Sequence, residues 1–267
     1  MPANKLKAVR GMHDILPQHS GHWARMEACI ARVFTSYAYR EIRMPIVEPS
    51  ALFQRSIGEV TDIVEKEMYT FADRNGESLS LRPEGTAGCV RACIENSLLE
   101  TPLKLWYAGP MFRYERPQKG RQRQFHQVGA EAFGWQGADI EAEMLLLNLR
   151  LWRELQLDDS IALQLNNIGS SEARRAFRAA LVDYLQKFQA DLDADSQRRL
   201  QSNPLRILDS KDRGTQKVLD DAPVLADFVD DESKRDFDRL LGLLDSSGVV
   251  AAQNPRLVRG LDYYNGT

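Results

Sequence analysis

The segment Phe112–Gly134 restricts the possible folds of this chain more than any other stretch. It reads FRYERPQKGRQRQFHQVGAEAFG and follows the apolar run LWYAGPMF. An apolar run, a basic stretch and a final alternation of apolar and polar residues predict strand, charged loop and strand. Residues 112–123 carry five positive charges and one negative charge, a net charge of +4.

The second of these strands predicts a polar pocket floor. If residues 124–134 are extended, Gln127, Gly129 and Glu131 share one face with Phe125 and Phe133. Two long polar side chains around a glycine suit a pocket better than a buried sheet face. The alternative is an exposed strand face, and the two phenylalanines argue against it. A cationic hairpin above such a pocket suits a polyphosphate together with a small polar molecule.

Composition narrows the class of protein. The chain has 267 residues, 43% of them hydrophobic, which allows a sizeable core and one or two domains. Because the net charge is −3, any contact with nucleic acid must be local. We find no signal-like segment and no apolar run of membrane-spanning length, and three cysteines cannot all pair with one another. We therefore expect a reduced, cytoplasmic protein without a membrane segment.

We expect no protein-bound metal. Cys89 and Cys93 would lie on one helical face, but no histidine is near them in sequence, so we interpret them as small core residues. The sequence has no phosphate-binding glycine loop, no dinucleotide fingerprint and no set of nucleophile and base. Chemistry on phosphate would therefore depend on positioning and on positive charge. The four histidines, which show no metal-binding spacing, are His13, His19, His22 and His126.

Helical spacing of apolar residues predicts helices over residues 22–37, 86–98 and 139–155. For the second helix we expect Thr86 to be the N-cap residue. The residues expected on the inner side of this helix are Val90, Ile94 and Leu98.

Strand signals precede the second helix. Residues 41–47 are strand-like but contain Pro45, which favours an edge position or an irregular end. Residues 69–71 and 79–81 flank a polar turn with Asn75-Gly76, so we predict a hairpin there.

The composition changes near Asn166. Residues 170–247 carry 13 Lys and Arg against 16 Asp and Glu, and they are rich in helical patterns. The helices expected in this stretch cover 171–189, 193–201 and 231–246. We therefore divide the chain into the first part of a core (1–166), a helical insert (167–248) and a return to the core (249–267). Because the sequence stops at Thr267 within an expected strand, we interpret the chain as shortened.

Three clusters have residues suited to binding chemistry. Arg82-Pro83-Glu84-Gly85-Thr86 lies between a strand and a helix, and its simpler interpretation is an ordinary helix start. Arg113, Arg121, Gln127 and Glu131 form the second cluster, and its simpler interpretation is a solvated hairpin. The third is LVRGLDYY at residues 257–264, with paired tyrosines that could stack and donate hydrogen bonds. It could equally be a core strand with one exposed arginine.

Together these segments resemble the histidyl-tRNA synthetase family, within the class II aminoacyl-tRNA synthetases. AVRGMHDILP resembles the family's N-terminal signature, and residues 22–49 resemble the first class motif, which builds a dimer interface. GPMFRYERPQKGRQRQFHQVGAEAFG resembles the second class motif. LRPEGT and LVRGLDYY resemble the histidine-specific segments. The resemblance covers essentially the whole chain and implies an α+β fold, with an antiparallel sheet flanked by helices and a helical insert.

The resemblance also implies an activity and partners. A homodimer would form histidyl-adenylate from histidine, ATP and Mg²⁺, and would then transfer histidine to tRNA(His). Arg113 would hold the α-phosphate, Arg121 the outer phosphates, and Arg259 would place positive charge at the reacting carboxylate and phosphate. The insert would lie against the acceptor arm of the tRNA, with a local patch of Arg174, Arg175 and Arg178.

The resemblance assigns the histidine pocket residue by residue. Glu131 and Tyr264 would bind the imidazole ring, and Tyr263 would line the pocket. Strand alternation alone turns Tyr264 away from the face of Tyr263, so the assignment of Tyr264 depends on the resemblance. The residues that would bind the amino group are Glu84, Thr86 and Gln127.

One departure from the family pattern is large. The third class motif, which carries a further ATP-binding arginine, and the C-terminal anticodon-binding domain are both missing from the sequence. We therefore expect this chain alone not to complete the ligase reaction. Two other functions remain open: a synthetase-like, histidine-sensing regulatory subunit of ATP phosphoribosyltransferase, and a plain RNA-binding module.

Overall fold

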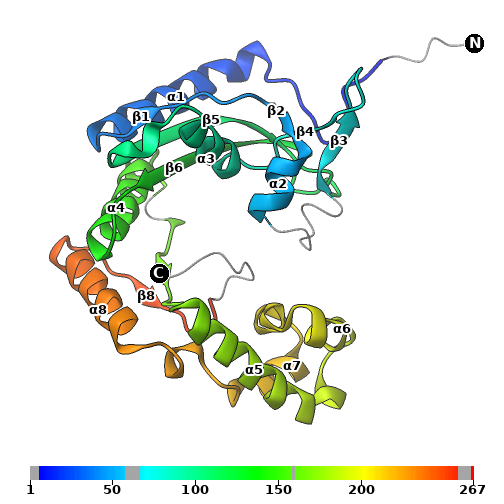
Figure 1. Cartoon of the computed structure of the whole chain (residues 1–267), viewed down its shortest axis with the longest axis vertical. Coiled ribbons are helices and arrows are strands. Elements are labelled where there is room, and N and C mark those ends of the chain that lie inside the picture. The colour runs from blue at the N-terminus through cyan, green and yellow to red at the C-terminus, as the bar shows by residue number, and fades with distance from the viewer. Residues whose placement is uncertain (1–5, 58–66, 158–159, 258–265) are drawn as a thin grey trace, which may run out of the picture. The chain divides into compact units, whose positions relative to one another are not determined.

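The computed structural model describes residues 6–57, 67–157, 160–257 and 266–267. It has an α+β fold with antiparallel strands flanked by helices, which confirms the predicted fold class (Figure 1). The chain forms two compact units. The first comprises residues 1–135 and 147–157, and the second comprises 136–146 and 158–267. The division at 166 and 248 stays a prediction.

A long antiparallel hairpin is the centre of the first unit. Strands β5 (Leu103–Phe112) and β6 (Gln124–Phe133) pair over ten residues, with Leu103 opposite Phe133 and Phe112 opposite Gln124. The short strand β1 (Arg40–Glu41) adds to β5 in parallel. The predicted strand, charged loop and strand are therefore confirmed.

A second, smaller sheet has the order β2-β4-β3. Its strands are β2 (Val47–Pro49), β3 (Tyr69–Ala72) and β4 (Ser78–Leu81), and the last two form the predicted hairpin. The single strand predicted for residues 41–47 is wrong, because β1 ends and β2 begins within this range, on either side of Pro45. A short helix that we did not predict, α2 (Ser50–Ile57), follows β2.

Helix α1 (Pro17–Ser36) covers one face of the hairpin. Pro17 occupies the first helical turn, where its missing N–H has no partner to lose. The ring of Phe34 packs 5.4 Å, centroid to centroid, from Trp106 of β5. The predicted amphipathic helix is confirmed and begins five residues earlier than expected.

Helix α3 (Thr86–Glu95) covers the opposite face. Its Cys89 and Cys93 are buried against Leu105 and Tyr107, which alternate along β5 with Trp106. Both cysteines are therefore core residues, as expected. Burial raises the pKa of each thiol, which makes them less reactive.

The inner side predicted for α3 is wrong. Ile94 is 65% exposed and Leu98 is 42% exposed, and Val90 is only half-buried. Small residues instead face the sheet, because they let the helix backbone approach it closely. The buried residues of this helix are Ala87, Gly88, Cys89, Ala92 and Cys93.

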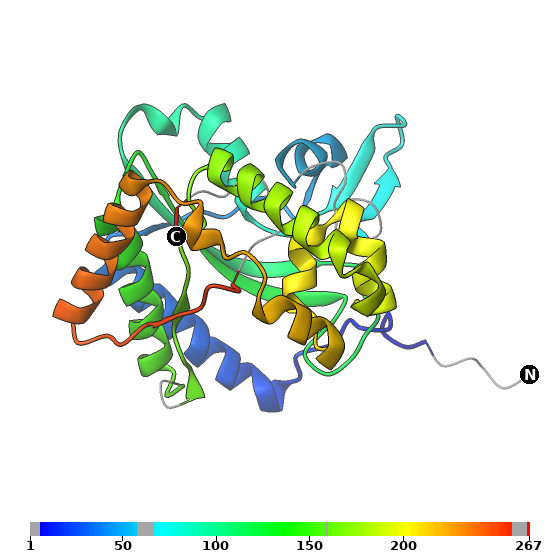
Figure 2. The same cartoon turned by 90° about the horizontal axis from the view of Figure 1, so that it is seen from below.

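Helix α4 (Ala138–Glu154) begins in the second unit and ends in the first. The second unit continues with α5 (Ser171–Lys187), α6 (Ala194–Ser202) and α8 (Asp231–Ser246), as predicted, and with α7 (Arg213–Asp220), which we missed. Helices α5, α6 and α7, coloured from yellow-green to gold, lie near one another in Figure 2. They share one apolar core that includes Phe177, Leu181 and Ile207. Short 3₁₀ helices occur at Leu98–Glu100, Gln189–Asp191, Pro204–Asp209 and Leu225–Asp227.

Some of the acidic residues of the insert are N-caps of helices. Asp193, Asp212 and Asp230 precede α6, α7 and α8, and each carboxylate accepts a backbone N–H of the first turn. Hydrogen bonds from Ser196, Ser210 and Thr215 hold the pKa of Asp193 well below its usual range. The net charge of this stretch therefore reflects local structure as well as a solvated surface.

Strands β7 (Gln164–Leu165) and β8 (Ala252–Gln253) pair in parallel in the second unit. Strand β8 is the described part of the predicted return to strand, and most of LVRGLDYY lies outside the described residues. Within the described chain, every helix is too short or too polar to cross a membrane.

Candidate functional site

The start of α3 is organised by Glu84. Its carboxylate accepts the backbone N–H groups of Thr86 (2.5 Å) and Ala87 (3.0 Å). A carboxylate at this position satisfies orphan N–H groups and complements the helix dipole. By its backbone, Gly85 is the N-cap residue and Thr86 is already helical. The prediction that Thr86 caps the helix is therefore wrong.

The Thr86 hydroxyl has a different partner. It donates to Oε1 of Glu131 at 2.8 Å, across from the helix to strand β6. The Tyr107 hydroxyl donates to the same oxygen at 3.1 Å. The structure thus brings Glu84 and Thr86, at the start of α3, together with Glu131 on β6. It adds Tyr107, on β5, which sequence reasoning missed.

The surroundings of Glu131 raise the pKa of its carboxyl above the ordinary value. Burial raises the pKa of its carboxyl, and the nearby charge of Glu84 acts in the same direction. The hydrogen bonds from Thr86 and Tyr107 oppose this shift because they stabilise the ionised form. Burial also raises the pKa of Tyr107, so its hydroxyl stays protonated and available as a donor at neutral pH.

The interpretation of Gly129 needs correction. Gln127, Gly129 and Glu131 do share a face, as alternation predicted, but the space above Gly129 holds the ring of Tyr107. In the strand register Tyr107 lies directly opposite Gly129. The glycine therefore makes room for a neighbouring side chain and does not itself open a cavity.

Two arginines of the second cluster lie in different surroundings. Arg113 donates from Nε to the Pro83 carbonyl at 2.9 Å, and its guanidinium lies 5.1 Å from the centre of the Phe125 ring. This places Arg113 beside the segment that leads into α3. Arg121 lies on the exposed hairpin loop and pairs with Glu115 at 3.1 Å.

Arg82 is a buried cation that supports the site. Only 6% of the residue is exposed, and it donates to the carbonyls of Met44 (3.1 Å) and Pro110 (3.0 Å). Burial lowers the pKa of its guanidinium. These bonds tie the end of β4 to two other segments, a role that an ordinary helix start would not give this residue.

Arg259, Tyr263 and Tyr264 lie outside the described residues. Their assigned roles stay predictions. Among the residues that the structure describes, no cluster of three or more histidine, cysteine or acidic side chains could hold a metal ion.

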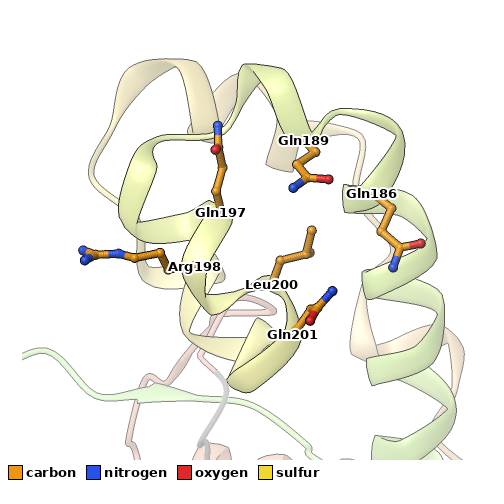
Figure 3. Close-up of a pocket in the computed structure, with 6 residues that line it drawn as sticks. All are labelled: Gln186, Gln189, Gln197, Arg198, Leu200 and Gln201. Carbon is orange, nitrogen blue, oxygen red and sulfur yellow. The ribbon is translucent and has the colours of Figure 1, made fainter.

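The insert carries two neighbouring hollows on α5 and α6. Figure 3 shows the more polar one, of about 330 Å³, in which Leu200 lies between amide side chains while Arg198 points outward. Its amides are those of Gln186, Gln189, Gln197 and Gln201. Arg175 and Arg178 line the other, of about 520 Å³. The predicted arginine patch is wrong in one member, because Arg174 is buried at 8% exposure.

A family model described as histidyl-tRNA synthetase matches residues 11–267.

The chain belongs to the histidyl-tRNA synthetase family.

Solved structures of this family and its relatives share the fold. The apo histidyl-tRNA synthetase of S. aureus is 36% identical with a TM-score of 0.76, and the match covers 98% of this chain and 60% of that one. This chain thus spans about three fifths of the length of that synthetase.

Two more distant structures show the likeness of fold alone. One, from Bacillus halodurans C, is described as an ATP phosphoribosyltransferase regulatory subunit/histidyl-tRNA synthetase. It is 20% identical with a TM-score of 0.70, covering 100% of this chain and 72% of that chain. A histidine--tRNA ligase subunit from Alicyclobacillus acidocaldarius is 19% identical with a TM-score of 0.66, covering 98% and 84%.

Proposed function

We propose that this site binds histidine and takes part in its activation by ATP for transfer to tRNA(His). The observation that carries the proposal is the half-buried carboxylate of Glu131, held by two hydroxyl groups beside the start of α3. A carboxylate in such a site accepts an imidazole N–H, and it favours a ligand that can donate a hydrogen bond there.

The hydroxyl of Thr86 supports binding of an amino group at the same site. Its proton is used in the bond to Glu131, so toward a ligand this oxygen can only accept. An ammonium group can only donate, which makes the two complementary. The remaining acceptor capacity of Glu84 and the amide oxygen of Gln127 would complete the contact.

The arginines support the binding of ATP. In the proposed reaction the histidine carboxylate attacks the α-phosphorus, the adenylate forms and pyrophosphate leaves. Arg113, beside the segment that leads into α3, would contact the α-phosphate, and Arg121 would exchange Glu115 for the outer phosphates. Arg259 would add positive charge at the reacting groups.

We propose that a magnesium ion arrives with the nucleotide and that one carboxylate of this chain contacts it. Mg²⁺ commonly keeps several waters and binds through substrate phosphates with one or two carboxylates. Glu115, whose side chain is only 16% exposed on the hairpin, is the carboxylate that would become available when Arg121 turns to phosphate. When bound, the ion would neutralise charge on the phosphates.

We further propose that the protein is a homodimer and that Arg175 and Arg178 contact the acceptor arm of the tRNA. The paired hollows on α5 and α6 offer arginines and amides, which bind phosphates and sugars. A cytoplasmic location stays a prediction.

Histidine binding and pyrophosphate exchange test the proposal. The protein at its natural length should bind histidine, which calorimetry measures, and should discriminate against phenylalanine, which lacks the ring N–H. It should also exchange pyrophosphate into ATP in a histidine-dependent manner.

Two outcomes would count against the proposal. Histidine binding without exchange would favour the histidine-sensing regulatory subunit, and salt-dependent RNA binding without any affinity for histidine would favour an RNA-binding module.

A further inference from the structure

The ring of Tyr107 is held in a slot made by two glycines. A Cβ added at Gly85 or at Gly129 would lie under 3.0 Å from three atoms of the Tyr107 side chain. Gly85 belongs to the segment before α3, and Gly129 lies opposite Tyr107 in the β5–β6 register. The two backbones therefore leave only enough room for an aromatic ring at this position.

The slot fixes the position of the Tyr107 hydroxyl. It donates to Oε1 of Glu131 at 3.1 Å, and Thr86 donates to the same oxygen at 2.8 Å. Within the described part of the chain, no hydrogen bond ends on the second oxygen, Oε2. Among the described residues, the protein thus occupies one oxygen of the carboxylate and leaves the other as an acceptor.

We propose that Tyr107 is a positioning residue for histidine selection, which fixes Glu131 so that Oε2 accepts a ring N–H of the substrate. This inference rests on the proposed function, because it assigns Glu131 to the imidazole. It adds a role for a side chain on β5 that acts through Glu131. The ring in the glycine slot supplies the rigidity, and the hydroxyl supplies the orientation.

The hydroxyl also affects the charge of Glu131. Among the described residues, the titratable groups that face this carboxyl are Tyr107 from β5, Cys89 and Cys93 from α3, and Glu84 from the preceding segment. Burial and Glu84 raise the pKa of Glu131, while the hydroxyl bond lowers it. Without that bond, the carboxyl holds its proton to a higher pH. A protonated carboxyl is a weaker acceptor for a ring N–H than the carboxylate.

The test is the variant Tyr107→Phe, which keeps the ring in its slot and removes only the hydroxyl. Calorimetry across neutral pH should show histidine affinity about 10-fold weaker at pH 7, the scale of one hydrogen bond to a charged group. The acid limb of the affinity profile should move to higher pH. The titration of histidine itself is common to both proteins and cancels. ATP affinity should not change.

The matched control is Tyr184→Phe. This change also removes a single tyrosine hydroxyl bond, here to the Val218 carbonyl in the second unit. It should leave histidine affinity and its pH profile unchanged. Thermal unfolding of both variants tests whether they remain folded.

A double-mutant cycle separates positioning from general packing. Gly129→Ala should push the ring from its slot and weaken histidine binding on its own. Tyr107→Phe should then add little in the Gly129→Ala background, because the hydroxyl has already left Glu131. Additive losses would overturn the proposed coupling.

The failures are distinguishable. If the unaltered protein does not bind histidine, both the proposed function and the role of Tyr107 are wrong. If the unaltered protein binds histidine and Tyr107→Phe has the same affinity and the same pH profile, the proposed function stands and the role of Tyr107 is wrong.

Discussion

At the scale of single residues, the ionised side chain of Glu131 lowers the stability of the fold but is the form proposed to bind histidine. Its carboxyl is half-buried, and burial raises its pKa above the ordinary value of about 4.3. The folded state therefore binds the proton more tightly than the unfolded state. The protonated carboxyl therefore adds to the free energy of unfolding. This contribution is fully present below the pKa of Glu131 in the unfolded state, and it is lost as the pH rises through the pKa in the folded state. At neutral pH the carboxylate is retained at the expense of stability.

Glu131→Gln should separate these two effects. The amide oxygen can still accept the hydroxyls of Thr86 and Tyr107, while the charge and one acceptor are lost. A mispaired buried polar group costs about 1–3 kcal/mol, so kcat/KM for histidine should fall by roughly one to two decades. Affinity for ATP should change little. Histidine-dependent pyrophosphate exchange by the protein at its natural length measures both.

For stability, we expect Glu131→Gln to have the opposite effect, a relative gain at neutral pH. Because the glutamine side chain does not titrate, the stability of Glu131→Gln relative to the unaltered protein should increase as the pH rises from about 4 to about 7. Urea unfolding at both pH values measures this difference. A variant that retains wild-type kcat/KM for histidine would show that Glu131 does not contact the ring.

At the scale of elements, one carboxylate organises the start of α3. Glu84 satisfies two backbone N–H groups of the first turn, and this leaves the Thr86 hydroxyl to reach β6. The helix start and the candidate pocket are therefore built by adjacent residues with separate roles. Capping fixes the helix, and the hydroxyl links it to the sheet.

Glu84→Ala and Thr86→Val should separate capping from binding. Loss of the Glu84 carboxylate should cost about 1 kcal/mol of unfolding free energy, the typical value for a cap, and should weaken histidine binding as well. Thr86→Val keeps the cap, so it should weaken binding with a smaller loss of stability. Urea unfolding and calorimetry measure the two effects.

Glu77→Ala, which alters an exposed carboxylate at the β3–β4 turn, is the control for these variants. It should affect neither stability nor binding appreciably. Equal stability losses in Glu84→Ala and Thr86→Val would contradict the assignment of the cap to Glu84.

At the scale of the whole molecule, the first unit has a hollow beneath α1. Its volume is about 650 Å³, and residues of α1, β5, β6 and the segment 41–46 line it. The apolar residues that line it include Trp23, Met26, Ile42 and Val128. Charged side chains, among them Glu27, Glu41 and Arg43, line it as well. A hollow that combines apolar and polar side chains is suited to protein–protein contact, which supports the proposed homodimer.

Met26→Glu should weaken the dimer. A carboxylate on the lining of the hollow would lose its hydration when the second protomer binds, so the monomer fraction should rise. Gln18→Glu adds the same charge at an exposed position of α1 and should leave the assembly unchanged. Sedimentation velocity over a range of concentrations measures both. If Met26→Glu dimerises like the unaltered protein, the hollow is not part of the interface.

Periodicity alone determined the elements of the site and the shared face of Gln127 and Glu131, because strand alternation and helical spacing are local properties of the chain. It could not determine which side of α3 is buried. Apolar residues lie on more than one side of that helix, and only close contact with β5 selects the small residues Cys89 and Cys93.

The tertiary structure also decided the partners within the site. The fit of Tyr107 against Gly129 depends on the pairing of β5 with β6, a register that neither strand carries by itself. The turn of the Thr86 hydroxyl toward Glu131 depends on where α3 lies on the sheet. The sequence therefore determines which residue types are present and which of them share one face of a helix or strand. The contacts between segments distant in sequence form only when the chain folds.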